Sequence, residues 1–439
     1  MANIAIRNGR VIDPASGLDH VTDVFIAGEK IAAVGMLPAG FKADETIDAT
    51  GLIVAPGLVD LCARLREPGN EFKNALVSEM HAAVAGGITS LVCPPDTDPV
   101  LDEPGLVEML RYRAKNLRGP RVFPAGALTL GLHGERLTEM AELKSHGCVA
   151  FSHADAPLID TQVLYRALQY AATFGYPVVL RPEDSHLAGE GVAHEGQIAA
   201  RLGLTAIPPE AETIGLLRIL ELVRLTGARV HLARLSCARS IDLMRAAKRD
   251  RLPVTCDIAV HHAHMTEMDI GFFDARCRVV PPFRAQADRT AIRAGLKDGT
   301  IDAICSDHAP VDEDSKQLPF GEAEPGVTSV ELLLPLTLKW AREEGVALSQ
   351  ALGLITSRAA AVFGLSGGKL AAGGNADLLL FAADEFWRIE PGALTSQGKN
   401  TPFIGYELQG RVHRTLVAGT SVFAAGVHAA RVRTPPVPN

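Results

Sequence analysis

The strongest constraint on the fold is a regular alternation of apolar runs with helical segments over residues 55–365. Segments with apolar residues three and four positions apart predict helices between the runs, for example at 74–85, 105–116, 159–174 and 211–226. Eight strands are expected, at 54–61, 90–93, 122–125, 149–151, 178–180, 230–235, 254–258 and 303–305. This alternation, closed by a helix at 348–363, predicts a parallel (β/α)8 TIM-like barrel.

The two ends of the chain follow a different pattern, that of short strands joined by turns. Near the start, Asn8-Gly9 and Gly28-Glu29 separate apolar runs. Strands are expected again at 378–381, 412–417 and 421–423. We therefore expect a small β-sandwich domain formed from both chain ends, residues 1–54 and 366–432, beside the barrel of residues 55–365. The proline-rich residues 433–439 are expected to be disordered.

Composition argues against several classes of protein. The net charge of −8 gives no general attraction to nucleic acid or anionic lipid. The seven cysteines include no CxxC pair, which favours reduced thiols over a disulfide framework. The sequence has no apolar run of about 18 residues and no apolar signal segment at its start. We expect a cytoplasmic protein with no nucleic-acid or membrane partner.

Three motifs lie where barrel strands end. The first motif begins with Pro56-Gly57-Leu58-Val59-Asp60 and runs through Cys62, Arg64 and Arg66 to Pro68-Gly69. The second motif is Pro94-Pro95-Asp96-Thr97, and the third is Asp307-His308-Ala309-Pro310. They resemble motifs of the dihydroorotases and hydantoinases, in the amidohydrolase superfamily, and the resemblance covers nearly the whole chain. It implies a site at the barrel mouth where one or two zinc ions polarise a cyclic amide and convert bound water to hydroxide.

The positions that the resemblance assigns to metal ligands are largely altered. Cys62 and Arg64 replace the two histidines of the first motif, and Arg181 and Arg234 replace two later histidines. His153 lies in the segment that carries the bridging ligand. Of the implied ligands only Asp307 remains, so its catalytic role is expected to be vestigial.

An arginine has no acceptor lone pair and stays protonated, so it is not a metal ligand. We expect no bound cofactor. The three arginines are expected to replace the charge of the metal and to pair with Asp307, Asp155 or Glu183.

The positions that the resemblance assigns to substrate binding are altered in part. Arg66 and His308 are retained as vestigial contacts, although Arg66 can equally be a structural ion-pair residue. Asp96 replaces an asparagine and would repel an anionic substrate, and Val280 replaces a polar contact.

Three functions remain open. The leading one is an inactive dihydroorotase homologue of pyrimidine biosynthesis, most like the non-catalytic subunit of bacterial aspartate transcarbamoylase. The resemblance implies the aspartate transcarbamoylase catalytic chain as partner, and a homo-oligomer within a larger assembly. The alternative is an active cyclic-amide hydrolase with a zinc site rebuilt from Cys62, His153 and Asp307. The third is an anion-binding or sensing protein that uses Arg66 and the other arginines of the mouth.

Overall fold

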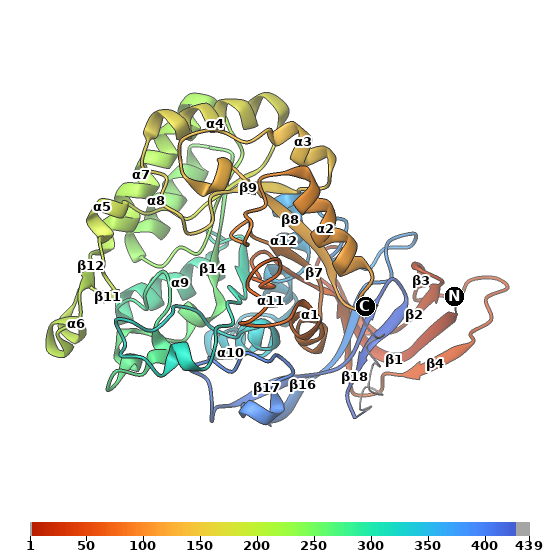
Figure 1. The fold of residues 1–439 in the computed structure, drawn as a ribbon. Coiled ribbons are helices and arrows are strands. Elements are labelled where there is room, and N and C mark those ends of the chain that lie inside the picture. Colours follow the sequence, from red (N-terminus) through yellow and green to blue (C-terminus); the bar gives the residue numbers. More distant parts are fainter. Residues whose placement is uncertain (1, 427–439) are drawn as a thin grey trace, which may run out of the picture.

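A barrel of parallel strands forms the larger part of the molecule in the computed structural model, which describes residues 2–426 (Figure 1). Its sheet has the order β15-β14-β13-β10-β9-β8-β7-β6. A bridge between Ala63 and His308 joins the ends of the first and last strands. The strands are β6 (Leu58–Asp60), β7 (Ile88–Cys93), β8 (Arg121–Ala127), β9 (Ala150–Ser152), β10 (Val178–Leu180), β13 (Val230–Leu232), β14 (Val254–Ala259) and β15 (Ala303–Cys305). The predicted (β/α)8 architecture is confirmed.

Helices surround this barrel, as expected for a parallel sheet whose strands are buried on both faces. The longer ones are α1 (Leu76–Ala85), α2 (Pro104–Lys115), α4 (Thr161–Phe174), α7 (Pro209–Thr226), α8 (Ala238–Arg249), α9 (Gln286–Asp298) and α10 (Leu333–Glu344). The shorter ones are α3 (Met140–Ser145), α5 (Ser185–Ala188), α6 (Gln197–Leu202), α11 (Leu348–Leu354) and α12 (Ser357–Phe363), and a two-stranded sheet pairs β11 (Ala193–His194) with β12 (Ala206–Ile207). The single helix expected at 348–363 is two helices, because Thr356 has φ −134° and ψ −101°, outside the helical region.

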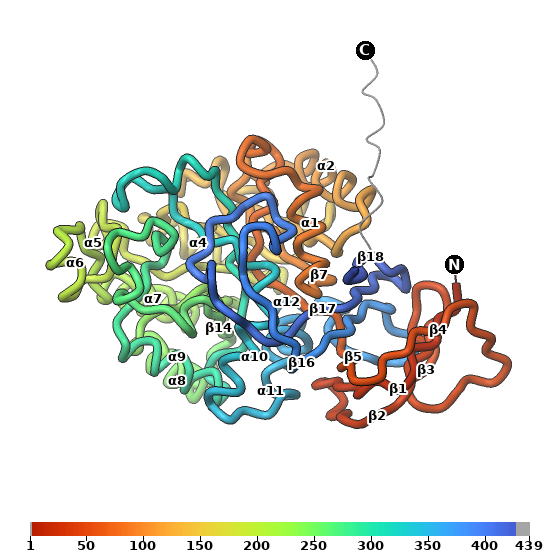
Figure 2. Tube along the Cα trace, turned by 90° about the horizontal axis from the view of Figure 1, so that it is seen from below, coloured from red at the N-terminus to blue at the C-terminus, as the bar shows by residue number. Residues whose placement is uncertain are grey.

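Strands from both chain ends share one further sheet, of order β18-β17-β16-β5-β1-β2-β3, with β4 also paired to β1 (Figure 2). They are β1 (Asn3–Asp13), β2 (Leu18–Ala27), β3 (Lys30–Val34), β4 (Glu45–Asp48), β5 (Ile53–Pro56), β16 (Leu378–Arg388), β17 (Glu407–Val417) and β18 (Thr420–Ala424). The antiparallel pairing of β5 with β16 joins the two halves. Ile6, Ile26, Val54 and Leu380 lie in one core cluster, so the chain ends form one folded unit. The tail expected to be disordered, 433–439, lies outside the described residues.

The strand expected at 54–61 is divided between the two sheets. β5 belongs to the chain-end sheet and β6 to the barrel, with Gly57 between them. A Cβ atom on Gly57 would lie 2.1 Å from the Thr89 side chain. Only glycine therefore fits where the chain passes from one sheet to the other.

Among residues 2–426, no helix has both the length and the apolar character needed to cross a membrane.

Candidate functional site

Three arginines at altered ligand positions and two carboxylates meet at one end of the barrel. Arg64 follows β6, Asp155 follows β9, Arg181 follows β10, Arg234 follows β13 and Asp307 follows β15. The carboxyl ends of parallel barrel strands share one mouth, which is where enzymes of this fold carry their active sites. Sequence positions up to 243 residues apart are thereby brought into direct contact.

Asp155 is the centre of an ion-pair network. Its carboxylate accepts hydrogen bonds from Nη2 of Arg64 at 2.5 Å, from Nε of Arg181 at 2.7 Å and from both Nη atoms of Arg234. The three arginine side chains are only 4–9% exposed. Burial alone would raise the pKa of Asp155, but Arg234, Arg64 and Arg181 outweigh it and hold that pKa well below its usual range. Asp155 is therefore an ionised carboxylate shared by three cations.

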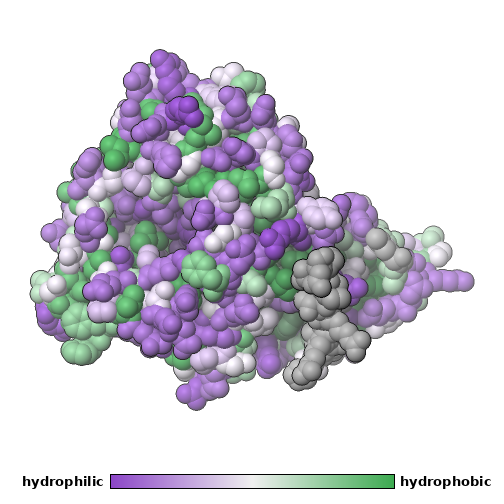
Figure 3. Space-filling view, viewed as in Figure 1, coloured by the Kyte–Doolittle hydropathy of each residue, from purple (hydrophilic) through white to green (hydrophobic). Residues whose placement is uncertain are grey.

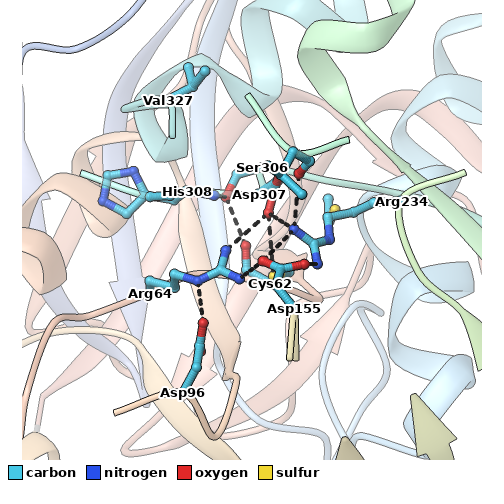
Figure 4. Close-up of polar contacts among 12 residues, drawn as sticks. Cys62, Arg64, Asp96, Asp155, Arg234, Ser306, Asp307, His308 and Val327 are labelled. Atoms are coloured by element: carbon cyan, nitrogen blue, oxygen red, sulfur yellow. Dashed lines mark hydrogen bonds and ion pairs between the residues drawn. The ribbon is translucent and has the colours of Figure 1, made fainter. Parts of the chain in front are cut away.

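Two of these arginines, Arg64 and Arg234, also form ion pairs with Asp307 (Figure 4). Its Oδ1 lies 3.3 Å from Nη1 of Arg64 and 3.1 Å from Nη1 of Arg234, so the expected pairing of Asp307 is confirmed. Burial raises the pKa of Asp307, and Arg234 and Arg64 oppose that rise. The thiol of Cys62 lies 3.7 Å from the same oxygen.

Most of the remaining donors of the arginines are also occupied, although the buried Nε of Arg234 has no hydrogen-bond partner within residues 2–426. Arg181 forms a two-point contact with the Glu183 carboxylate at 2.6 and 2.8 Å, and Nη1 of Arg234 reaches the Val280 carbonyl at 3.3 Å. Nε of Arg64 donates to Asp96 at 2.7 Å. Sequence reasoning treated Asp96 only as a charge hostile to substrate and missed this structural role. The sequence could have indicated this pair: Asp96 and Arg64 both differ from the residues that the resemblance implies, and they lie on loops that follow the adjacent strands β7 and β6.

The residues of the mouth do not fit a zinc ion. The His153 ring is held elsewhere, with Nε2 2.9 Å from the Thr129 hydroxyl and Nδ1 2.9 Å from the Ala156 carbonyl. Burial and the neighbouring Asp307 raise the pKa of Cys62 well above its ordinary value, so without a metal its sulfur is a thiol. Within residues 2–426, no three His, Cys, Asp or Glu side chains are arranged to hold a metal ion. A zinc site built from Cys62, His153 and Asp307 stays a prediction, and the placement of the His153 ring does not favour it.

The backbone of the mouth has a strained conformation at four non-glycine residues. Arg66, Ala154, Arg234 and Asp307 have φ of 61°, 48°, 56° and 48°. The left-handed region costs an ordinary residue about 1–2 kcal/mol. Such strain gathers at functional sites, where the surrounding structure fixes the direction of each side chain.

Comparison with known proteins identifies the family. Residues 51–240 match the family model described as dihydro-orotase-like. Proteins named "Dihydroorotase-like protein" from Pseudomonas putida and Pseudomonas aeruginosa are each 45% identical over 422 residues, which cover 95% of this chain and 98% of theirs. The chain belongs to the dihydroorotase-like family. A protein named dihydroorotase from Trichlorobacter lovleyi is 40% identical, over 96% of this chain and 99% of its own.

Solved structures place this dihydroorotase-like chain in the amidohydrolase fold. The L-hydantoinase of Arthrobacter aurescens superposes with a TM-score of 0.84 over 96% of each chain, at 23% sequence identity. The dihydropyrimidinase of Brevibacillus agri superposes with a TM-score of 0.82 over 95% of this chain and 94% of its own, at 22% identity.

The two residues expected as vestigial substrate contacts, Arg66 and His308, differ in their surroundings. Nε of Arg66 donates to the Pro310 carbonyl at 2.7 Å, and its Nη2 lies 3.9 Å from Glu324. Burial lowers the pKa of Arg66. The fully buried His308 accepts from the Ser329 N–H at Nδ1, so its Nε2 carries the proton and donates to Glu79 at 2.7 Å. Its ring points away from the arginines in Figure 4.

One small cavity lies against the arginines of this dihydroorotase-like mouth. A cavity of about 30 Å³ lies beside the network, lined among others by Cys62, Arg181, His231 and Asp257. Small-molecule pockets are commonly about 300–1,000 Å³, whereas about 15 Å³ suffices for one water. The cavity has room for water but not for a cyclic amide.

Proposed function

We propose that this dihydroorotase-like protein is catalytically inactive. The observation that carries the proposal is that the three arginines at the implied ligand positions are all paired with carboxylates in one buried network. The network occupies the place where the family's chemistry would need a metal and a substrate.

Electrostatics support this proposal. A divalent cation entering the mouth would meet three guanidinium charges that cannot be neutralised. Its attraction to Asp155 and Asp307 would compete with contacts of 2.5–3.3 Å that these carboxylates already make. Binding a metal would require the arginines to leave, which would strand their charges in a largely buried site.

The first test combines elemental analysis with an activity assay. Protein purified without chelator is expected to carry far less than one zinc per chain, and to neither cyclise carbamoyl aspartate nor hydrolyse dihydroorotate when zinc is added. A stoichiometric zinc that is lost on Cys62→Ala would overturn the proposal. So would turnover that Asp307→Ala abolishes.

For its cellular role, we propose a structural subunit that binds the aspartate transcarbamoylase catalytic chain in the cytoplasmic pyrimidine pathway. The support is the resemblance of the altered site to inactive dihydroorotase subunits of such assemblies. Sedimentation of the purified chain with the aspartate transcarbamoylase of the same organism is the test, and the two are expected to migrate as one complex. Separate migration at concentrations of about 10 μM, well above ordinary specific Kd values, would refute this role.

The second candidate is an active metal-dependent cyclic-amide hydrolase. Several relatives that are 40–41% identical are named dihydroorotase, which favours it. The same zinc and turnover measurements distinguish the two candidates.

A further inference from the structure

A larger cavity lies away from the barrel mouth, between the end of α1 and the last strands of the chain-end sheet. Its volume is about 460 Å³, and small-molecule sites commonly have about 300–1,000 Å³. Residues of β16, β17 and β18 line it, together with Ala85 of α1 and Glu331, which precedes α10. It shares no lining residue with the small cavity of the mouth. A role for this cavity therefore does not depend on whether the mouth is catalytic.

The Glu331 side chain is a buried carboxylate in the wall of this cavity, and it is only 7% exposed. Its Oε1 accepts a hydrogen bond from the Thr395 N–H at 2.8 Å, and its Oε2 accepts one from the Ser396 N–H at 3.1 Å. The ammonium of Lys399 donates instead to the carbonyls of Leu394 and Ser396. Among residues 2–426, no cationic side chain lies within salt-bridge distance of Glu331. The carboxylate is thus fixed in position but has no counter-ion.

A buried carboxylate without a counter-ion is energetically unfavourable, so it holds a proton more tightly than an exposed one. Burial raises the pKa of Glu331 to about 6, although the two backbone N–H groups oppose that rise. Above this pKa the group is ionised. A cation in the cavity would then be attracted to a charge that solvent screens little.

The two arginines of the lining already have partners of their own. Nη1 of Arg411 lies 3.2 Å from Glu385, and Nε of Arg388 lies 3.6 Å from Glu390. The side chains of Arg411 and Arg388 are 52% and 61% exposed, so solvent and salt screen their charges. The buried charge of Glu331 is therefore the one that a ligand in the cavity would meet with least screening.

The uncharged part of the lining supplies aromatic rings and space. Trp387 and Phe423 are lining residues, and aromatic rings attract organic cations, with tryptophan the most effective. Ala85, Gly410 and Ala424 carry at most a methyl group, which leaves room between the rings. In Figure 3, purple hydrophilic side chains predominate at the bottom of the view, where Figure 1 shows β16 and β17. The visible surface there is not a broad apolar patch of the kind that favours a protein partner.

We propose that this cavity is a binding site for a small organic cation that carries an alkylammonium or a guanidinium group. Glu331 is the counter-ion of this cation, and the rings of Trp387 and Phe423 form the walls beside it. The proposal adds a ligand site to the chain and does not rest on the loss of activity at the mouth.

Tryptophan fluorescence reports on this cavity, because the chain has two tryptophans and the other one, Trp340 of α10, is fully buried. The full chain is titrated with benzylammonium and, separately, with benzyl alcohol, a neutral molecule of nearly the same shape. Benzylammonium is expected to change the emission with a Kd below about 1 mM, and the alcohol to bind at least about tenfold more weakly. Trp387→Phe keeps an aromatic wall and should remove the emission change. Equal affinity for the two molecules, or no saturable change up to about 10 mM, would overturn the proposal.

The cation has two sources to distinguish, a free ligand and the chain itself. Arg431 and Arg433 follow Gly426, a lining residue, in the sequence and carry guanidinium groups. The same titration is therefore repeated with Arg431→Gln/Arg433→Gln. Tighter binding of benzylammonium would show that these arginines compete for Glu331. Unchanged binding would assign the site to a free cation.

Calorimetric titration of variants tests the role of Glu331. Glu331→Gln is expected to raise the Kd of benzylammonium at least about tenfold. The matched control, Glu108→Gln, removes a 66% exposed carboxylate from α2 and is expected to leave the Kd unchanged. Because Glu331→Gln also alters two backbone contacts, its melting temperature is measured, and Ala424→Phe is the second variant. Ala424→Phe keeps Glu331, fills the cavity and should abolish binding. A folded Glu331→Gln with wild-type affinity would refute the proposal, as would undiminished binding to Ala424→Phe.

Discussion

Asp155 is the residue on which the stability of the barrel mouth depends most. In Asp155→Asn the three arginines keep Asp96, Glu183 and Asp307 as acid partners but lose the one carboxylate that all of them share. Removing one partner of a buried pair typically costs about 3–5 kcal/mol. At about 2 cal/mol/K of unfolding entropy per residue, this loss lowers the Tm by about 3–5 °C for a chain of 439 residues.

Differential scanning calorimetry at pH 7 measures this loss. The control is Asp242→Asn, which removes a 58% exposed carboxylate from a surface pair with Arg245 and should cost less than about 1 kcal/mol. Asp307→Asn should fall between the two, because burial raises the pKa of Asp307 and its ionised form contributes less. A Tm of Asp155→Asn within 1 °C of the control would refute the reasoning.

The pH dependence of the same variant checks the electrostatic origin. The pKa of Asp155 is lowered in the folded state, so its contribution is present above the unfolded pKa of about 3.9 and is lost as the pH falls below it. The stability difference between wild type and Asp155→Asn should therefore shrink below about pH 4. A difference that stays constant would point to lost packing rather than lost charge.

Three further outcomes are expected. The double variant Cys62→His/Arg64→His should show no dihydroorotase activity with added zinc, because Arg181 and Arg234 remain in the mouth. It should also unfold at a lower temperature than the wild type, because the carboxylates that pair with Arg64 lose their cation. Burial raises the pKa of Glu331 to about 6, so its contribution to stability should be lost as the pH rises from about 4.5 to about 6, and Glu331→Gln should remove this loss in urea titrations across that range. Dihydroorotate or carbamoyl aspartate at about 1 mM should shift the Tm by less than about 1 °C, because the arginines that would contact such a ligand are already paired with carboxylates. A ligand that bound at 100 times its Kd would add about 2.7 kcal/mol, and a clear shift that Arg66→Ala removes would instead support the anion-binding function.

Much of the barrel follows from the sequence because its strands are short apolar runs between polar ends. The strand limits at 178–180 and 303–305 agree with β10 and β15. The errors come from tertiary context. The apolar run from 52 to 61, broken only by Pro56-Gly57, predicts one strand, since the residues on both sides of the break are equally buried. The break at Thr356 depends on its hydroxyl bonding to the Leu352 carbonyl, which propensity alone does not reveal.

The sequence also predicted which residues form the site, but not which of them contact one another. Arginines at former ligand positions predicted a network with Asp155, Glu183 and Asp307, and those contacts are present. The sequence did not reveal that one carboxylate would serve all three arginines, because this depends on the relative angles of β6, β10 and β13. Nor did it reveal that His308 would turn toward Glu79, a residue of α1.

The shared carboxylate has a consequence for the history of the chain. Arg64, Arg181 and Arg234 all donate to Asp155, so under the proposed loss of activity each arginine became part of the charge balance of the same carboxylate. Returning any one of them to histidine would leave the other two without gaining a usable metal site. The intermediate would thus be both inactive and less stable, so selection would act against each step back. If the proposed loss of activity is correct, the network acts against its reversal, and activity would return only through several simultaneous changes.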